Sequence, residues 1–215
     1  METTIVYHEM KQRSMAWTEI RLGKIGGSSL KSIIDISKKG KLKSMDTVLT
    51  SVADVISEIE TGFTNDSDYI SDAMEWGIEE EENAKELLMN DNTFECGFVE
   101  NSRFKYFGIS PDMLETENGV MSIGYEIKCP GSKKYAKYVI ENKLPTDHKV
   151  QVLGYFVAIP TLQKMKFVVY DPRFKTKKMH IVEVLRSDYK EFIENIEQSL
   201  IEFEKLVDEY LPKFR

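Results

Sequence analysis

Cysteine and histidine are scarce in this 215-residue sequence. The two cysteines, Cys96 and Cys129, are too few for a disulfide framework, a structural zinc site or an iron–sulfur cluster, so we expect two reduced thiols. The three histidines, His8, His148 and His180, are scattered, and nothing in their spacing suggests a zinc site. The sequence therefore argues against a fold built around disulfides or zinc.

Long apolar runs are also missing. No stretch of about 18 apolar residues exists, and the N-terminus has neither the basic start nor the apolar core of a signal peptide. We therefore expect a soluble, cytoplasmic protein with no membrane partner. Since 41% of the residues are hydrophobic and no repeat, low-complexity tract or linker interrupts the chain, we expect one domain over residues 1–215.

The charged residues are unevenly distributed. The net charge is −7, but residues 54–100 hold fifteen acidic residues against one lysine, which gives −14. Residues 128–178 hold twelve Lys and Arg against three acidic residues, which gives +9. This asymmetry indicates either one surface that faces a polyanion or simply two solvated faces of opposite charge.

Hydrophobic periodicity predicts an α/β fold of the α+β type, with a mixed sheet. Apolar residues recur at helical intervals over 45–59 and 73–89, and a long amphipathic helix is expected over 187–211, with an apolar stripe that serves as core or as a subunit contact. The remaining predicted elements are strands at 94–100, 104–110, 119–129, 164–171 and 178–185, and helices at 132–142 and 146–159.

A short strand with alternating character carries the most suggestive chemistry. In YEIKC (125–129), the side chains of Glu126 and Lys128 leave the same face of the strand, while Ile127 and Cys129 point into the core. Asp112 comes from the preceding hairpin. Carboxylates beside a lysine suit phosphodiester hydrolysis, because they offer oxygen ligands for Mg²⁺ and a cation that orients water. Taken alone, the pattern is weak, because it is common by chance in a chain with 30% charged residues, and it more often indicates a surface salt bridge.

The surrounding sequence is more specific. The segment SPDMLETENGVMSIGYEIKCP (110–130) resembles the SPDGL…LEIKCP core of the phage lambda-type alkaline exonucleases, a branch of the PD-(D/E)xK nucleases with a restriction-endonuclease-like core flanked by helices. Four further segments resemble the same family in the same order: MAWTEIRLGKIGGSSL (15–30), MEWGIEEEENA (74–84), HKVQVLGYFV (148–157) and YDPR (170–173). The resemblance covers nearly the whole chain.

This resemblance implies an active site that holds two Mg²⁺ ions, for which Mn²⁺ is expected to substitute. Its metal ligands would be Glu81, Asp112, Glu126 and the backbone carbonyl of Ile127. Lys128 would position and help to activate water, and Gln151 matches a glutamine of the family. Two alternatives stay open: residues 79–82 are all glutamate and could form a solvated acidic face, and Gln151 could be an ordinary helix-surface residue.

A second pocket is implied for the terminal 5′ phosphate of the substrate. Arg21, Ser28, Ser110 and Lys134 match the positions that bind it. Lys134 replaces an arginine of the family, and Lys133 beside it could fill the same role. A lysine lacks the planar fork of arginine, so the grip on phosphate would be less specific. Alternatively, Arg21 makes a surface ion pair or a helix-end contact.

The activity implied by the resemblance is a 5′→3′ exonuclease that digests one strand of linear double-stranded DNA and leaves 3′ overhangs for recombination by strand annealing. The implied partners are two further copies of the chain in a homotrimeric ring and a single-strand annealing protein, in the cytoplasm of a bacterial host if the gene is of phage or prophage origin. The alternatives are an endonuclease on the same fold and a catalytically silent DNA-binding member.

Overall fold

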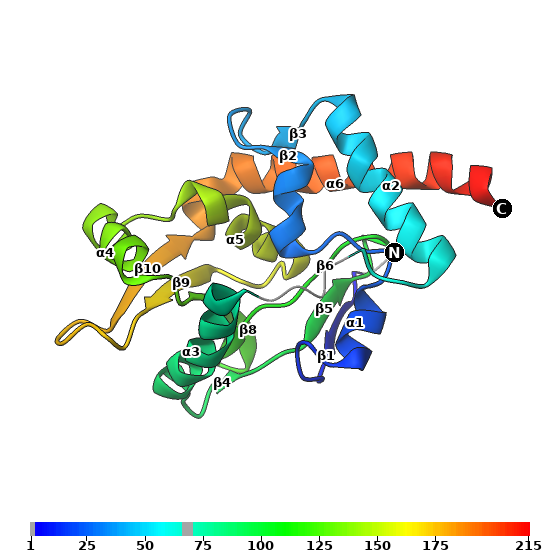
Figure 1. Cartoon of the computed structure of the whole chain (residues 1–215). Coiled ribbons are helices and arrows are strands. Elements are labelled where there is room, and N and C mark those ends of the chain that lie inside the picture. The colour runs from blue at the N-terminus through cyan, green and yellow to red at the C-terminus, as the bar shows by residue number, and fades with distance from the viewer. Residues whose placement is uncertain (1–2, 66–70) are drawn as a thin grey trace.

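The computed structural model describes residues 3–65 and 71–215 and has a mixed five-stranded sheet at its centre (Figure 1). The strand order is β10-β9-β8-β7-β4, in which β8 and β9 are parallel and every other neighbouring pair is antiparallel. The strands are β4 (Thr93–Phe94), β7 (Met113–Glu117), β8 (Val120–Lys128), β9 (Lys164–Tyr170) and β10 (Met179–Leu185).

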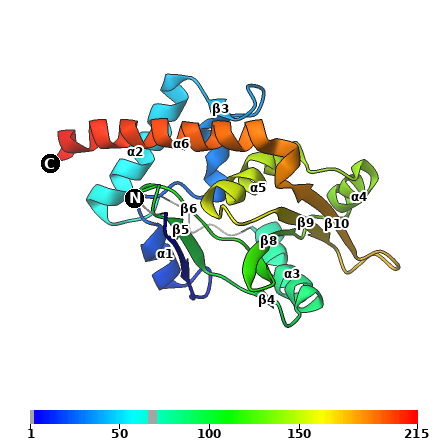
Figure 2. The same ribbon diagram turned by 180° about the vertical axis from the view of Figure 1, so that it is seen from behind.

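Two helices connect the parallel pair β8 and β9, as parallel strands require. They are α4 (Ser132–Glu141) and α5 (Thr146–Ala158), and α5 is buried along almost its whole second half. The long helix α6 (Lys190–Tyr210) packs against α5 and α2 (Met45–Thr61), as Figure 2 shows from behind. The apolar stripes predicted for 45–59 and 187–211 form this core, apart from their half-buried members Ile59 and Leu206.

Both faces of the sheet are covered. The residues of β9 that point to one face, including Phe167, pack with α5 and α6 in the main core, and those that point to the other face, including Val168, pack in a second, smaller core with Ala84 of α3 (Asp72–Leu88). A strand covered on both sides buries even its polar side chains. Glu126 and Ile127 of β8 are accordingly each 1% exposed.

A smaller sheet lies beside the large one and includes the first strand of the chain that the structure describes. It has the order β1 (Ile5–His8), β5 (Phe98–Asn101) and β6 (Gly108–Ile109), with antiparallel pairing. The helix α1 (Met15–Arg21), the 3₁₀ turn η1 (Gly27–Ser32) and the hairpin of β2 (Ile34–Asp35) and β3 (Lys41–Leu42) follow β1 along the chain. Two further 3₁₀ turns flank α6: η2 (Arg186–Tyr189) and η3 (Leu211–Phe214).

The structure confirms the mixed α/β fold and the long predicted elements, but it corrects the shorter ones. The predicted strand 94–100 is two strands in different sheets, and the break falls at Gly97, where a Cβ atom would lie 2.2 Å from the backbone oxygen of Met10. The predicted strand 104–110 is reduced to β6. The helix predicted at 187–211 begins as η2 and becomes α-helical at Lys190.

Helix α3 differs from the amphipathic helix that its sequence predicts. Leu87 is 65% exposed, whereas Glu80, Glu81 and Lys85 are buried. The face of α3 that meets the sheet is therefore largely charged, and charged groups are buried only where they are paired.

In the described part of the chain, no helix has both the length and the apolar composition needed to cross a membrane.

Candidate active site

Asp112 is fixed by the pairing of β7 and β8. It directly precedes β7, and its backbone N–H donates to the carbonyl of Tyr125 over 3.2 Å. Its carboxylate oxygen Oδ2 accepts a hydrogen bond from the backbone N–H of Ile127, with N···O 2.6 Å. Main-chain geometry thus places Asp112, which is only 7% exposed, against the end of β8.

Glu126 is held by three side chains. Its Oε1 accepts a hydrogen bond from Gln151 Nε2 (2.7 Å) and forms an ion pair with Lys128 Nζ, while its Oε2 accepts one from the hydroxyl of Tyr155 (2.6 Å). Gln151 and Tyr155 are four residues apart on α5, so they lie on the same face of the helix. Gln151 is therefore no ordinary surface residue, because it contacts Glu126 directly.

Glu81 lies on the buried charged face of α3. Its Oε1 is 3.2 Å from Lys85 Nζ, and its Oε2 accepts a hydrogen bond from Arg13 Nη2 over 3.3 Å. Lys85 is nearly enclosed, with 4% of its side chain exposed, and also pairs with Glu82 and Glu95. Burial narrows the choice of which glutamate among residues 79–82 faces the site. Glu79 and Glu82 are exposed, whereas Glu80 and Glu81 are buried.

The YDPR segment anchors α3. The carboxylate of Asp171 is fully buried and binds the guanidinium of Arg173 at 2.7 and 2.8 Å, and it accepts a hydrogen bond from Ser132 Oγ at the start of α4. The guanidinium of Arg173 lies 4.4 Å from the ring centroid of Trp76 on α3. Since Glu81 is five residues after Trp76, this contact helps to set its position.

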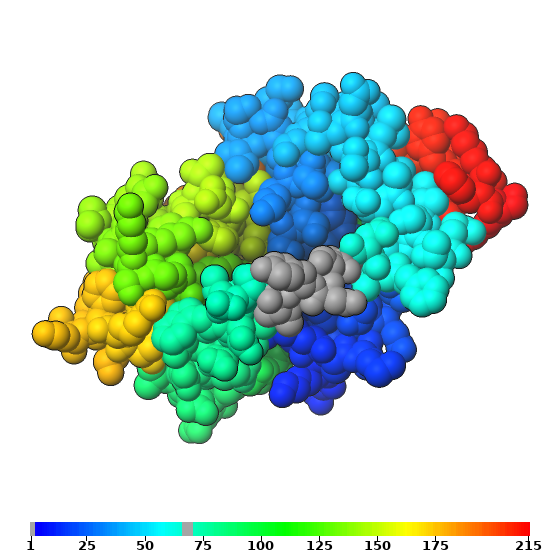
Figure 3. Space-filling model, viewed as in Figure 1, coloured from blue at the N-terminus to red at the C-terminus, as the bar shows by residue number. Residues whose placement is uncertain are grey.

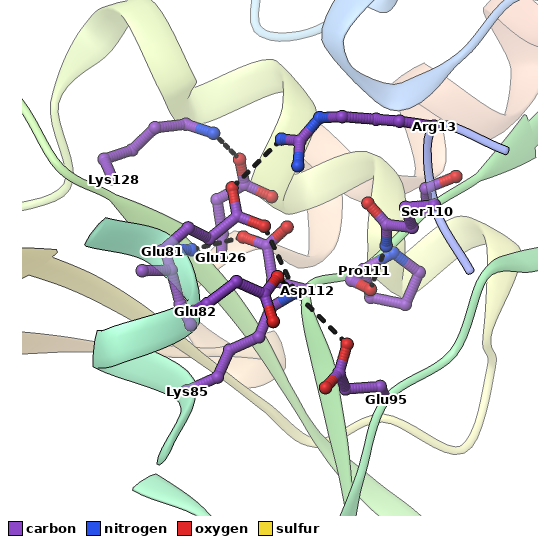
Figure 4. Close-up of polar contacts among 12 residues, drawn as sticks. Arg13, Glu81, Glu82, Lys85, Glu95, Ser110, Pro111, Asp112, Glu126 and Lys128 are labelled. Atoms are coloured by element: carbon purple, nitrogen blue, oxygen red, sulfur yellow. Dashed lines mark hydrogen bonds and ion pairs between the residues drawn. The ribbon is translucent and has the colours of Figure 1, made fainter. Parts of the chain in front are cut away.

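The charges at this end of the sheet interact strongly. Burial raises the pKa of Asp112 well above its usual value, and the carboxylates of Glu126 and Glu81 raise it further. Burial alone would lower the pKa of Lys128, but Glu126 and Asp112 outweigh that effect and hold it above its usual value. The lysine therefore stays protonated beside three acidic side chains, which Figure 4 shows gathered at one place.

These carboxylates suit a hard cation such as Mg²⁺, which prefers oxygen ligands. Oε1 of Glu81 is buried, and within the described ranges it has the ion pair with Lys85 at 3.2 Å but accepts no hydrogen bond of good geometry. Within residues 3–65 and 71–215, however, no three Asp, Glu, His or Cys side chains lie in positions from which they could together hold one metal ion. Lys85, Lys128 and Arg13 pair with the carboxylates instead, so the metal-binding roles stay predictions.

A cleft of about 410 Å³ opens next to these residues. Its lining residues include Glu81 and the basic side chains of Arg13, Lys128 and Lys134, together with His148. On the face seen in Figure 3, the teal surface of α3 lies beside the green surface of α4, and both helices contribute to the cleft. A polyanion that entered here would meet these cations and Glu81, the one acidic side chain among the lining residues in the described part of the chain.

The residues expected to bind a 5′ phosphate are only partly brought together. The guanidinium of Arg21 lies 3.8 Å from the ring centroid of Trp17, whose indole N–H donates to Ser110 Oγ over 2.9 Å. Ser28 is exposed on η1. Lys134 instead lines the cleft beside Lys128, whereas Arg21 lines a separate pocket of about 260 Å³.

Cys129 directly follows the last residue of β8. It is half-buried and packs against the smaller core, as expected. Burial and the nearby Glu81 raise its pKa to about 12, so the thiol keeps its proton.

Sequence reasoning missed three residues of the site: Tyr155, Lys85 and Arg13. Tyr155 and Lys85 follow Gln151 and Glu81 by four residues, and this i,i+4 spacing on helices could have identified both. Arg13 pairs with Glu81 across 68 positions of sequence, and no local pattern signals such a contact.

Comparisons with known proteins place the chain in a family. Two solved structures of LHK-Exo, an alkaline exonuclease from Laribacter hongkongensis, share the fold: the first has 22% identity, a TM-score of 0.76 and coverage of 93% of this chain and 95% of that one. The second, a complex with dAMP, has 23% identity, a TM-score of 0.71 and coverage of 93% and 97%. No curated protein shows significant sequence similarity. Residues 16–159 match the model of the YqaJ-like viral recombinase domain, and the chain belongs to that family.

Proposed function

We propose that the protein is a Mg²⁺-dependent 5′→3′ exonuclease that digests one strand of linear double-stranded DNA. Membership in the YqaJ-like viral recombinase family and the shared fold with an alkaline exonuclease support DNA cleavage. The observation that carries the proposal is the cluster of Glu81, Asp112 and Glu126, buried beside the protonated Lys128 at one end of the sheet.

The acidic residues of the cluster share one task. Glu81, Asp112 and Glu126, with the carbonyl of Ile127, would hold two Mg²⁺ ions, and Mn²⁺ would substitute. The bound metal would lower the pKa of a water molecule and stabilise negative charge on the scissile phosphate.

The remaining chemistry belongs to side chains of this chain. The ammonium of Lys128 orients the attacking water by donating a hydrogen bond and offsets charge on the phosphate. Gln151 and Tyr155 keep Glu126 in one orientation, which pre-organises the site before DNA binds. Water attacks phosphorus and gives up one proton to solvent, the bond between phosphorus and the leaving oxygen breaks, and that oxygen takes up a proton from solvent.

Recognition of a strand end would depend on the pocket around Arg21. Arg21 and Ser110 already share Trp17 as a neighbour, and Ser28 and Lys134 would complete the grip on a terminal 5′ phosphate. We further propose a homotrimeric ring that encloses DNA, with the basic surface of residues 128–178 facing inward, and a single-strand annealing protein as partner.

A second candidate is an endonuclease on the same fold. The observation that favours it is the position of Lys134, which lines the cleft beside Lys128 and not the pocket of Arg21. An enzyme that cuts within a strand needs a cation near the scissile phosphate but no anchor for a terminal one.

The two candidates are separated by one assay with end-labelled linear duplex and closed circular DNA, each incubated with Mg²⁺ and with EDTA. An exonuclease digests only the linear DNA, from its 5′ ends, and only with Mg²⁺. Cutting of closed circles would favour the endonuclease, and absence of any Mg²⁺-dependent cutting would reject both.

A further inference from the structure

Arg13 has a backbone conformation that is unfavourable for its residue type. Its φ is +66°, in the left-handed region that suits glycine and, to a lesser degree, asparagine. In the described residues, the other non-glycine positions with positive φ are Lys39, Asn118 and Asn142. A strained residue of this kind persists only when its neighbours fix it.

The residues on both sides of Arg13 are fixed in this way. The amide of Gln12 donates to the carbonyls of Cys96 (3.1 Å) and Pro111 (3.0 Å), and the second of these directly precedes Asp112. Ser14 caps the first turn of α1 by accepting a hydrogen bond from the N–H of Trp17. The chain thus turns sharply at Arg13 between two anchored residues.

The turn directs the guanidinium into the active-site cleft. Figure 4 shows Arg13 reaching toward Glu81 from the side opposite the α3 backbone, and Arg13, Lys128 and Lys134 line the same cleft. Its contact with Glu81 uses one nitrogen, at 3.3 Å. Within the part of the chain that the structure describes, no other acidic side chain lies within ion-pair distance of Arg13.

Stability does not explain this arrangement. Glu81 already has a buried cationic partner in Lys85, and the side chain of Arg13 is 45% exposed, where ion pairs contribute little. A left-handed backbone is a cost that the single ion pair hardly offsets. The remaining explanation lies in what the guanidinium can bind from solution.

We propose that Arg13 binds a backbone phosphate of the DNA strand held in the cleft, opposite Lys128, and so positions that strand over the carboxylates. This proposal rests on the proposed nuclease function. The contact with Glu81 uses only one of the N–H donors of the planar guanidinium. The remaining donors can form two parallel hydrogen bonds to the oxygens of a phosphate group. The contact is to the backbone, so it is independent of base sequence.

The test replaces Arg13 by glycine, which removes the guanidinium and at the same time suits the left-handed backbone. Affinity for a fluorescently labelled 5′-phosphorylated duplex is measured in EDTA, where metal-dependent cutting does not occur, over a series of salt concentrations. Loss of a bidentate phosphate contact is expected to weaken binding about tenfold or more and to reduce the salt slope by about one.

Two further variants control for the release of backbone strain and for the loss of positive charge. Lys39→Gly makes the same backbone change at φ +54°. Lys39 is not among the residues that line the cleft and pairs with the exposed Glu191, so this variant should leave binding unchanged. Arg13→Lys keeps the charge and loses the fork, so its affinity should lie between those of the native protein and Arg13→Gly. The Tm of Arg13→Gly should equal the native value or exceed it by up to about 3 °C.

The outcomes are distinct. Native affinity and salt slope in Arg13→Gly, in a protein that digests DNA with Mg²⁺, would overturn the role of Arg13 and leave the nuclease proposal intact. A marked fall in Tm would assign Arg13 a structural role and likewise overturn the proposal. If the native protein neither binds nor digests DNA, both proposals fail.

Discussion

Tyr155→Phe tests how far cleavage depends on the orientation of Glu126. The substitution removes one oxygen atom and fills nearly the same volume, so the packing of this fully enclosed ring should survive. The hydroxyl donates to Glu126 Oε2 over 2.6 Å. Burial and the Glu126 carboxylate raise the pKa of Tyr155 well above its usual value, so the hydroxyl remains a donor at every practical pH.

The magnitude follows from the contact. A hydrogen bond to a buried carboxylate contributes about 1.5–3 kcal/mol, and Glu126 keeps its contacts with Gln151 and Lys128. If the full contribution is needed in the transition state, single-turnover digestion of linear duplex should slow by about 10- to 150-fold. The Tm should fall by roughly 3–12 °C, because a carboxylate that is 1% exposed loses a partner.

Tyr138→Phe is the matched control. Tyr138 is also buried, but its hydroxyl lies 3.4 Å from the ring nitrogen Nε2 of His148, a long contact with a neutral partner. Digestion by this variant should stay within about twofold of the native rate. The reasoning is refuted if Tyr155→Phe loses stability as expected yet digests DNA at the native rate, because the hydroxyl would then support folding alone.

Three further predictions concern the carboxylates, the strand end and acid stability. Glu81→Gln should abolish most Mg²⁺-dependent digestion, whereas the exposed Glu79→Gln should be mild; equal losses would show that α3 presents a different residue to the site. Arg21→Ala should slow digestion of 5′-phosphorylated ends by on the order of tenfold and hurt 5′-hydroxyl ends much less, measured as initial rates on one duplex; equal loss on both ends would contradict a phosphate anchor. Burial and the nearby Lys128 and Lys134 lower the pKa of His148 from 6.5 to about 4, and Asp147 and Lys31 act on it more weakly. Its neutral form therefore stabilises the fold above pH 6.5, and this contribution, about 1–2 kcal/mol for a partly exposed ring, is lost as the pH falls from 6.5 to about 4. Denaturant unfolding at pH 7 and 4.5 should show a smaller loss for His148→Asn than for the native protein, and an unchanged loss would contradict the assignment.

The long elements were predictable because their apolar residues follow a regular period. Helix α2 and strands β8, β9 and β10 fall within a few residues of their expected bounds. The strands β4 and β6 have two residues each, too few for a period to be visible. The turn at Gly97 depends on the close approach of Met10, which lies in a segment far away in sequence, and no local signal reports that contact.

The relative positions of site residues were predictable where the residues lie on the same strand or helix. Strand alternation correctly put Glu126 and Lys128 together, and motif spacing drew attention to Gln151 before its contact with Glu126 was known. The burial of Glu81 and Lys85 contradicts the usual rule for charged residues, and it is explained only by the partners that folding supplies.

The strain at Arg13 was invisible in the sequence, because backbone conformation at a single position depends on the anchors at Gln12 and Ser14. The arrangement of Lys134 was also unforeseeable. Its neighbours in sequence suggested the 5′-phosphate pocket; in the structure Lys134 is among the residues that line the cleft, and its role in phosphate binding stays a prediction. The backbone conformation of Arg13 and the position of Lys134 thus depend on contacts between segments that are distant in sequence, which short motifs do not reveal.

The central claim is that DNA is cut at the buried carboxylates beside Lys128. The most direct measurement compares Lys128→Ala with the native protein in two assays on one linear duplex: binding in EDTA and digestion with Mg²⁺. The account predicts that Lys128→Ala folds, binds DNA within a few-fold of the native affinity and digests it at least about a hundredfold more slowly, because the ammonium no longer orients water. Digestion by a folded Lys128→Ala at close to the native rate would contradict the claim.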